Sequence, residues 1–438
     1  MKKMSSFCDK VLGIIVLNAF LFAFSPVTEA QLLPEGYWHN KERILRYTPD
    51  GEDFVIINGD GKFNRALYGT NTGFRVETGD LPEFGLYLPG MGGNMQLGII
   101  RDEDSKWLND AQYIKSVYRP GARIYEISDP FAGQLRLTVL AMGNAEGMII
   151  RVETQQLSTG TELFWIYGGA STERFSREGD LGADPPDCFA LKPDACRNNK
   201  FSIVRNTFDL SCGSNGAVTL TGTFPEDSRL KLGSPYAVTT PLDVWLSQEG
   251  LAPVLAGRCR MESGETYYLA IQNKSSKSTM PYAELHDSFE QAEAARQQIA
   301  GTLKIHTPDP YFNTLGGALS IAADGIWEPE SWLHGAIGWR MRLNGWRAAY
   351  TGDIMGWHDR ARGHFNGYAA SQTVNVDPVI PHPAQDKQLH LARAEKTWGT
   401  PMYSNGYICR NPYQTGVMHH YDMNLCYIDE LLWHFNWT

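Results

Sequence analysis

Motifs of the common catalytic classes are missing from this chain. Its 438 residues contain no G-x-S-x-G, no H-E-x-x-H, no P-loop and no G-x-G-x-x-G between a strand and a helix. A C-x-x-C pair, which is typical of zinc and thioredoxin-type sites, is also missing. Serine hydrolases, zinc peptidases and nucleotide-dependent enzymes that carry these motifs gain no support, and we expect neither a cofactor nor a metal.

Positive charge is scarce as well. The chain has 39 Lys and Arg against 49 Asp and Glu, a net charge of −10. Nucleic acids and anionic membranes bind basic surfaces, so we expect no nucleic-acid partner. Beyond residue 30 no apolar run approaches the roughly 20 residues of a membrane-spanning helix, and we expect no transmembrane anchor.

The N-terminus has the pattern of a secretory signal peptide. Lys2 and Lys3 precede the apolar run 11–24, and Thr28-Glu29-Ala30 is a cleavage site. We predict a signal peptide over residues 1–30 and a protein that is exported to the periplasm or the extracellular space.

Six cysteines follow the signal peptide, and an even number in an exported chain permits disulfides. We predict a bridge between Cys188 and Cys196, which would close a loop containing Pro193. The full set is Cys188, Cys196, Cys212, Cys259, Cys409 and Cys426.

Residues 31–283 have the pattern of a β-sandwich domain. Leu135, Leu137 and Val139 alternate with polar residues, which indicates strands with one buried face. Many such runs are separated by Gly, Pro and Asp/Asn turns, too many for one small sandwich. We expect two large stacked antiparallel sheets.

Helices follow the strands, so we expect an α+β multidomain chain. Ser288-x-x-Gln291 is a capping box that opens a linker helix within 284–308. Residues 309–438 form the helical domain, which opens with Asp309-Pro310. The first predicted helix of this domain places Tyr311, Leu315, Leu319 and Ala322 on one face. The other predicted helices are 354–368, capped by Asp353, then Pro383 to Lys396, and a last helix from Tyr421.

The segment 332–365 is rich in Trp, Arg and Gly. A helix over 335–350 would have to accommodate Gly335, Gly338 and Gly345, each unfavourable in a helix interior. The alternative is an extended loop that turns at Asn344-Gly345, a strong hairpin signal. We favour the extended loop, in which the side chains of the segment border a pocket.

Glycoside hydrolysis is one chemistry that such a pocket could serve, and it needs two carboxyl groups. The candidates in the helical half are Glu328, Glu330, Asp353 and Asp422. No pair stands out as acid and base. Aromatic residues make up 12% of the chain, which fits sugar stacking or a Trp-rich core equally well.

The order of signal peptide, sandwich, linker helix and DPYFNTLGGALSIAADGIW resembles the six-hairpin glycosidases, and GWRAAYTGDIMGWHDRA is similar to a loop at the mouth of their toroid. The resemblance implies a β-supersandwich followed by the first helices of an (α/α)6 toroid. It also implies a truncated chain, because the catalytic acid of such proteins usually lies in the middle hairpins of the toroid and this chain ends after roughly two. The predicted substrate-binding residues are Trp332, His334, Trp346, Arg347, Tyr350, Asp353, Trp357, Asp359 and Arg360.

The sequence is consistent with three functions. The first is an exported glycoside hydrolase, or its N-terminal part, that acts on an oligo- or polysaccharide. The second is a carbohydrate-binding protein without catalysis. The third and weakest is a polysaccharide lyase, because lyases that combine a toroid with β-sheets usually place the toroid first.

Overall fold

The computed structural model describes residues 37–38, 41–42, 45–60, 64–173, 189–213, 216–335, 340–342, 349–374, 384–386, 391–393, 406–415 and 421–438. The predicted signal peptide lies outside this set. The chain forms two compact units, Met1–Tyr47 and Thr48–Thr438. In the first unit, β1 (Tyr37–Trp38) pairs antiparallel with β2 (Lys41–Glu42).

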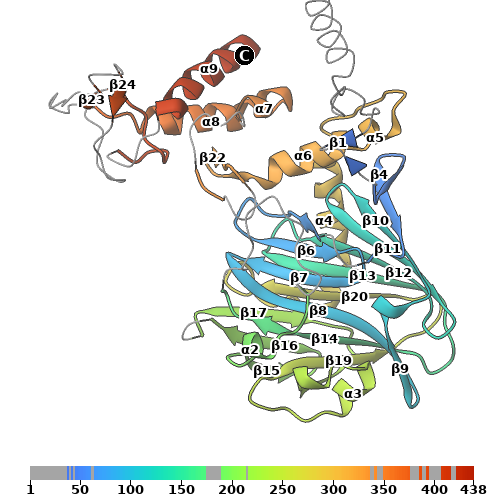
Figure 1. Ribbon diagram of the computed structural model, residues 1–438. Helices are drawn as coiled ribbons and strands as arrows, with labels where there is room; N and C mark the ends of the chain where they lie inside the picture. The colour runs from blue at the N-terminus through green and yellow to red at the C-terminus, as the bar shows by residue number, and fades with distance from the viewer. Residues whose placement is uncertain are drawn as a thin grey trace, which may run out of the picture. The chain divides into compact units, whose positions relative to one another are not determined.

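Two antiparallel sheets form most of the second unit (Figure 1). The ten-stranded sheet has the order β15 (Lys200–Val204), β16 (Thr207–Cys212), β17 (Val218–Thr223), β20 (Thr266–Asn273), β13 (Gly147–Gln156), β12 (Gly133–Ala141), β11 (Ala122–Asp129), β10 (Tyr113–Arg119), β4 (Asp53–Ile57) and β3 (Thr48–Asp50). The eight-stranded sheet has the order β18 (Arg229–Gly233), β19 (Val254–Arg260), β14 (Glu162–Ala170), β8 (Gly90–Arg101), β7 (Glu83–Leu88), β6 (Arg75–Gly79) and β5 (Asn64–Leu67), with β9 (Asp104–Trp107) paired to β8.

The alternation in the sequence accounts for this sandwich. Leu137 and Val139 of β12 point inward and pack with Trp165 and Tyr167 of β14 in one buried core. Burying a side chain of this size stabilises the fold by about 1.5–3 kcal/mol. The prediction of two stacked antiparallel sheets followed by helices is confirmed, and the fold is α+β.

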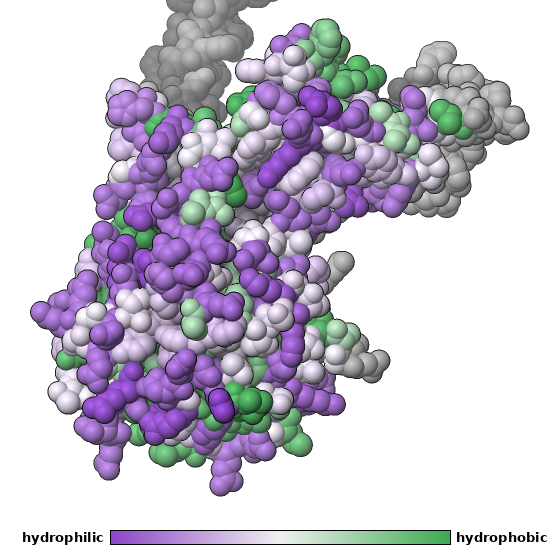
Figure 2. Space-filling model, turned by 180° about the vertical axis from the view of Figure 1, so that it is seen from behind, coloured by the Kyte–Doolittle hydropathy of each residue, from purple (hydrophilic) through white to green (hydrophobic). Residues whose placement is uncertain are grey.

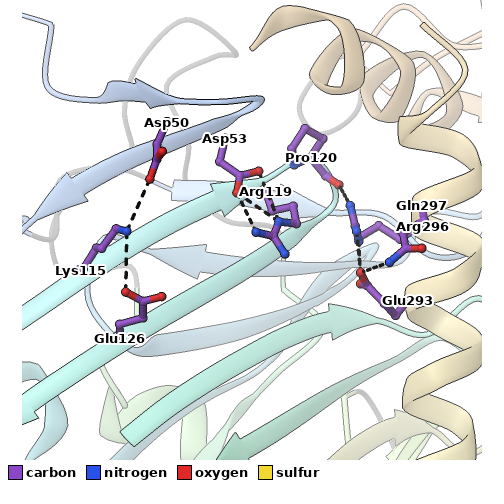
Figure 3. A network of polar contacts seen from close by, with 9 residues as sticks. All are labelled: Asp50, Asp53, Lys115, Arg119, Pro120, Glu126, Glu293, Arg296 and Gln297. Carbon is purple, nitrogen blue, oxygen red and sulfur yellow. Dashed lines mark hydrogen bonds and ion pairs between the residues drawn. The ribbon is translucent and has the colours of Figure 1, made fainter. Parts of the chain in front are cut away.

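The linker helix α4 (Leu285–Ala300) lies against the ten-stranded sheet. Figure 3 shows how Arg296 holds it there, donating to the Pro120 carbonyl at 2.7 Å while its guanidinium pairs with Glu293. The helix is where the sequence placed it, but the capping box is wrong. Ser288 lies one turn inside α4 and is buried, because Leu285 and Phe289 pack on the sheet and draw the preceding turn into the helix.

The remaining helices of the described residues are α5 (Pro310–Asn313), α6 (Leu315–Gly325), α7 (Ala349–Ile354), α8 (His358–Ala369) and α9 (Tyr421–Trp437). Two short hairpins accompany them, β21 (Trp327–Glu328) with β22 (Ser331–Trp332) and β23 (Ala384–Asp386) with β24 (Leu391–Arg393). The predicted helix from Pro383 to Lys396 is therefore wrong, since pairing of two strands overrides its helical composition. Asp309 caps α5 as predicted, accepting from the Tyr311 amide at 2.8 Å.

The apolar stripe of Leu315 and Leu319 on α6 faces solvent. Leu315 and Leu319 are 36% and 48% exposed, whereas Gly316 and Ser320 are buried. The reason is close backbone approach: a Cβ on Gly316 would lie 2.6 Å from the Leu303 carbonyl oxygen, and the Ser320 hydroxyl accepts from the Leu303 amide. Helix α6 packs through its small residues.

Helix α9 begins where the sequence predicted but leaves large apolar side chains in contact with solvent. Leu425, Ile428, Leu432 and Phe435 are 71%, 55%, 59% and 78% exposed. Figure 2 shows one face of the molecule, which is mostly hydrophilic, with hydrophobic side chains gathered in small patches. Among the described helices, none has the length and apolar character needed to span a bilayer.

Candidate functional site

A cleft of about 490 Å³ lies between loops of the sandwich and the segment that follows α6. We name it the loop-71 cleft. A volume of this order is typical of small-ligand sites. Its lining residues are Asn71, Thr72, Gly73, Pro89, Glu328, Leu333, Arg340 and Arg342.

Glu328 is the carboxylate of the loop-71 cleft. The β21–β22 hairpin presents it to two guanidinium groups, with Arg340 Nη2 2.6 Å from Oε2 and Arg342 Nη2 3.2 Å from Oε1. Arg340 also donates to the Thr72 carbonyl at 2.7 Å. Both carboxylate oxygens are occupied, so Glu328 anchors two arginines, and a role as free acid or base would require these ion pairs to open.

A second ion pair borders the same sandwich loop. Asp324, in the last turn of α6, accepts from Arg360 Nη1 at 2.8 Å, and the Asn71 amide donates to the Asp324 carbonyl at 3.2 Å. The Arg360 guanidinium lies over the Trp357 and Trp327 rings, 4.7 and 5.6 Å from their centroids. Arg360 is thus held by a carboxylate and two indoles.

Asp353 binds two histidines from different helices. Its carboxylate lies 2.8 Å from His358 Nδ1 at the start of α8 and 2.8 Å from His434 Nδ1 on α9. Because an ionised carboxylate only accepts, each Nδ1 donates its proton to Asp353. The prediction that Asp353 caps the helix 354–368 is wrong, because Asp353 lies inside α7 and the cap position of α8 is Trp357, which makes no side-chain cap bond.

Trp332 belongs to the core of the helical part, contrary to its predicted place in the pocket. It is 1% exposed, and its Nε1 donates to the Ala323 carbonyl at 3.1 Å. A Cβ on Gly352 would lie 2.2 Å from the Trp332 ring, so the ring packs directly on the α7 backbone. Trp332 therefore supports the hairpin that carries Glu328.

His364 is the buried histidine of the same core. It is 1% exposed, and burial lowers its pKa to about 3. Its Nδ1 accepts from the Trp332 amide at 3.3 Å, so the ring is neutral with the proton on Nε2. Tyr368 lies beside it, with ring centroids 4.7 Å apart, and burial raises the pKa of the Tyr368 phenol.

Other predicted residues are not brought into the loop-71 cleft. The Asp359 side chain is 95% exposed and pairs with Arg362. Glu330 is exposed, and its hydrogen bond to Tyr413 raises the pKa of that phenol. Tyr350 is half-buried on α7. Trp346, Arg347 and the Asp422 side chain lie outside the described residues.

The extended form expected for 335–350 is confirmed at 332–335 and 340–342, but it is wrong at Ala349 and Tyr350, which belong to α7. Leu333 and Arg342 form an antiparallel bridge, and the His334 amide donates to the Met341 carbonyl at 2.9 Å. This pairing replaces the alternative helix at these positions and directs Arg340 and Arg342 to Glu328. The predicted turn at Asn344-Gly345 falls outside the described residues.

Cys196 is a buried free thiol, and burial raises its pKa to about 11. Cys188 lies outside the described residues, but because the Cys196 thiol is free, the predicted bridge between these two cysteines is wrong. No cluster of three or more His, Cys, Asp or Glu side chains that could hold a metal occurs within the described part of the chain.

Sequence reasoning missed several residues that make the site. The alternation of Arg340 and Arg342 was a signal that both side chains leave one face of an extended segment. Asn71 and Thr72 gave no signal, because they meet their partners only through the fold. His434 lies 81 positions from Asp353, and nothing local to α9 marks it as a carboxylate ligand.

Comparison with known proteins gives limited matches. A family described as a domain of unknown function (DUF4450) matches residues 88–293. No curated protein matches the chain. Among solved structures, a bacterial glucoamylase complexed with acarbose shares 10% identity at a TM-score of 0.44, covering 72% of this chain and 53% of that one.

Two α-mannosidase structures of glycoside hydrolase family 92 from Bacteroides thetaiotaomicron are also similar. The inverting mannosidase shares 7% identity at a TM-score of 0.33, covering 65% of this chain and 36% of that one. The other shares 10% identity at a TM-score of 0.25, covering 62% and 40%. The chain spans about half or less of the length of each solved structure.

Proposed function

We propose that this protein is an exported carbohydrate-active protein of the glycoside hydrolase type, and that the loop-71 cleft is its saccharide-binding wall. The observation that carries the proposal is the Glu328–Arg340–Arg342 cluster in a cleft of about 490 Å³. Charged, planar side chains of this kind donate and accept hydrogen bonds with fixed geometry, which suits a ligand covered in hydroxyl groups.

A second candidate, carbohydrate binding without turnover, is favoured by one observation. Hydrolysis needs two carboxyls, about 5–5.5 Å apart for retention or about 6.5–9.5 Å for inversion. Two of the four candidate carboxylates have basic partners: two arginines at Glu328 and two histidines at Asp353. Such partners hold carboxylates in place as hydrogen-bond acceptors, a role that fits ligand positioning.

The experiment that tests the proposal measures binding and turnover together. The protein is run by affinity electrophoresis through polygalacturonate, rhamnogalacturonan, arabinan and starch, and each polymer is then assayed for new reducing ends. Retardation with new reducing ends supports a hydrolase, and retardation alone supports the binding protein. Product that absorbs in the near ultraviolet would revive the lyase. Neither retardation nor turnover on any polymer would overturn the proposal.

A further inference from the structure

A groove of about 370 Å³ lies on the solvent face of the ten-stranded sheet, formed by β10, β11, β12 and β13. We name it the sheet groove. Its lining residues are Tyr113, Glu126, Ile127, Ser128, Gln134, Leu135, Arg136 and Gln155, and none of them lines the loop-71 cleft.

The strand register explains why this part of the face is open. Residues of alternate parity point to the solvent side, and at one end of the strands Ala122, Leu140 and Ile149 are covered by α4. At the other end the same parity brings Ser128 and Gln134 side by side across the β11–β12 pair. The helix covers the apolar end of the face and leaves the polar end free.

The groove side chains keep their hydrogen-bonding groups available. Tyr113 is 38% exposed, and no described residue makes a ring contact or a side-chain hydrogen bond with it. Within the described part of the chain, the side chains of Ser128, Gln134 and Gln155 likewise have no hydrogen-bond partner. An aromatic ring and several free hydroxyl and amide groups therefore meet in one concave surface.

The charges of the groove are balanced by neighbours in the sheet. Figure 3 shows Lys115 between Asp50 and Glu126, at 3.6 and 3.7 Å. Arg136 lies 4.0 Å from Glu153 on the adjacent strand. An anionic or cationic ligand would have to compete with these pairs, so a neutral ligand fits the groove better.

We propose that the sheet groove is a second binding site, and that its ligand is a neutral oligosaccharide segment. The Tyr113 ring offers an apolar surface for a sugar face, because aromatic rings combine a large contact area with a polar tip. Gln134 and Gln155 each supply both donors and an acceptor for hydroxyl groups. The site binds a polymer chain along the sheet and leaves the loop-71 cleft free.

The test is affinity electrophoresis through soluble starch, galactomannan and xyloglucan. Four single variants and one double variant are compared with the native chain: Tyr113→Ala, Gln134→Ala, Tyr236→Ala, Arg342→Met, and Tyr113→Ala with Arg342→Met. Tyr236 is an exposed tyrosine away from both sites, at 71% exposure, and serves as the matched control. Circular dichroism checks that each variant is folded.

We expect at least one polymer to retard the native chain, and Tyr113→Ala to weaken that retardation by about tenfold, a usual effect of removing an aromatic anchor. Gln134→Ala should weaken it less, and Tyr236→Ala should leave it unchanged. The double variant, Tyr113→Ala with Arg342→Met, should bind less than Arg342→Met alone. This difference is expected whether or not the loop-71 cleft binds a saccharide. Native-like retardation of Tyr113→Ala, or no retardation by any neutral polymer, would overturn the sheet-groove site.

Discussion

Arg340 donates to the Thr72 carbonyl at 2.7 Å, joining residues 268 positions apart. The same Nη2 atom lies 2.6 Å from Glu328. One guanidinium thus connects a loop of the sandwich to the β21–β22 hairpin, and the loop-71 cleft lies around it. Arg342 approaches the other oxygen of Glu328 but makes no hydrogen bond to the sandwich loop among those described.

Substitution of Arg340 should reduce the stability of the fold more than substitution of Arg342. Arg340→Met leaves a part-buried Glu328 oxygen and the exposed Thr72 carbonyl without their donor, and we expect a loss of about 1–3 kcal/mol in the free energy of unfolding. Arg342→Met, at a side chain 33% exposed, should cost less than about 1 kcal/mol. Urea denaturation measures both. Equal losses for the two variants would contradict the connecting role of Arg340.

Asp353 should control the attachment of α9. Asp353→Asn removes the charge that holds His358 and His434, and we expect α9 to be cleaved faster in limited proteolysis at neutral pH. Asp359→Asn is the matched control, because that side chain is 95% exposed. Cleavage of α9 at the native rate in Asp353→Asn would show that apolar contacts such as Phe365 with Tyr427 suffice.

His364 should make the fold sensitive to acid. Its pKa is about 3 when folded and about 6.5 when unfolded, so the unfolded chain binds the extra proton between these values. Stability therefore falls as the pH drops below about 6.5, by about 2 kcal/mol at pH 5. His364→Leu should remove this component of the slope in urea denaturation from pH 7.5 to 5, whereas His306→Leu, at an exposed position, should not. An unchanged slope in His364→Leu would refute the neutral buried ring.

Glu83 should make the fold less stable as the pH rises, which is opposite to the effect of His364. Burial, opposed by a hydrogen bond from Asn109 and reinforced by Asp80, raises its pKa to about 7 from the usual 4.5. The folded chain holds the proton that the unfolded chain loses, so the stabilisation is complete below about 4.5 and is lost as the pH rises to about 7, by about 3 kcal/mol. Glu83→Gln keeps the acceptor for Asn109 and should be more stable than the native chain at pH 8.

The control for this prediction is Glu103→Gln, which alters an exposed carboxyl. Thermal denaturation at pH 5 and pH 8 measures the difference between the variants. If Glu83→Gln lowers stability at pH 8, the carboxyl is ionised and paired in the folded chain, and the raised pKa is refuted.

Local patterns in the sequence predicted the parts of the fold that depend on local forces. Alternation around Leu137 places β12, and Asp309-Pro310 starts α5 because one carboxylate satisfies the first free amides. The face of α6 could not be predicted in this way. Its large apolar side chains Leu315 and Leu319 face solvent, whereas Gly316 and Ser320 are buried because small side chains allow two backbone segments to approach.

The candidate site was predictable only in outline. The segment was correctly expected to be extended at 332–335 and 340–342, where two of its arginines reach one carboxylate, but the expectation failed at Ala349 and Tyr350, which lie in α7. Which carboxylate the arginines reach, and which sandwich loop joins them, depends on contacts between distant parts of the chain. Trp332 was misplaced for the same reason, since its burial depends on Gly352 of another helix.

Hydrogen–deuterium exchange with and without oligosaccharide fragments of rhamnogalacturonan, arabinan and starch tests the central claim most directly. A saccharide in the loop-71 cleft excludes water from both walls, so we predict slower amide exchange in 68–74 and in 327–335 together. Arg342→Met should abolish that protection, and Arg260→Met, at a side chain 63% exposed on β19, should preserve it. Unchanged exchange in both segments with every fragment would contradict saccharide binding in the cleft.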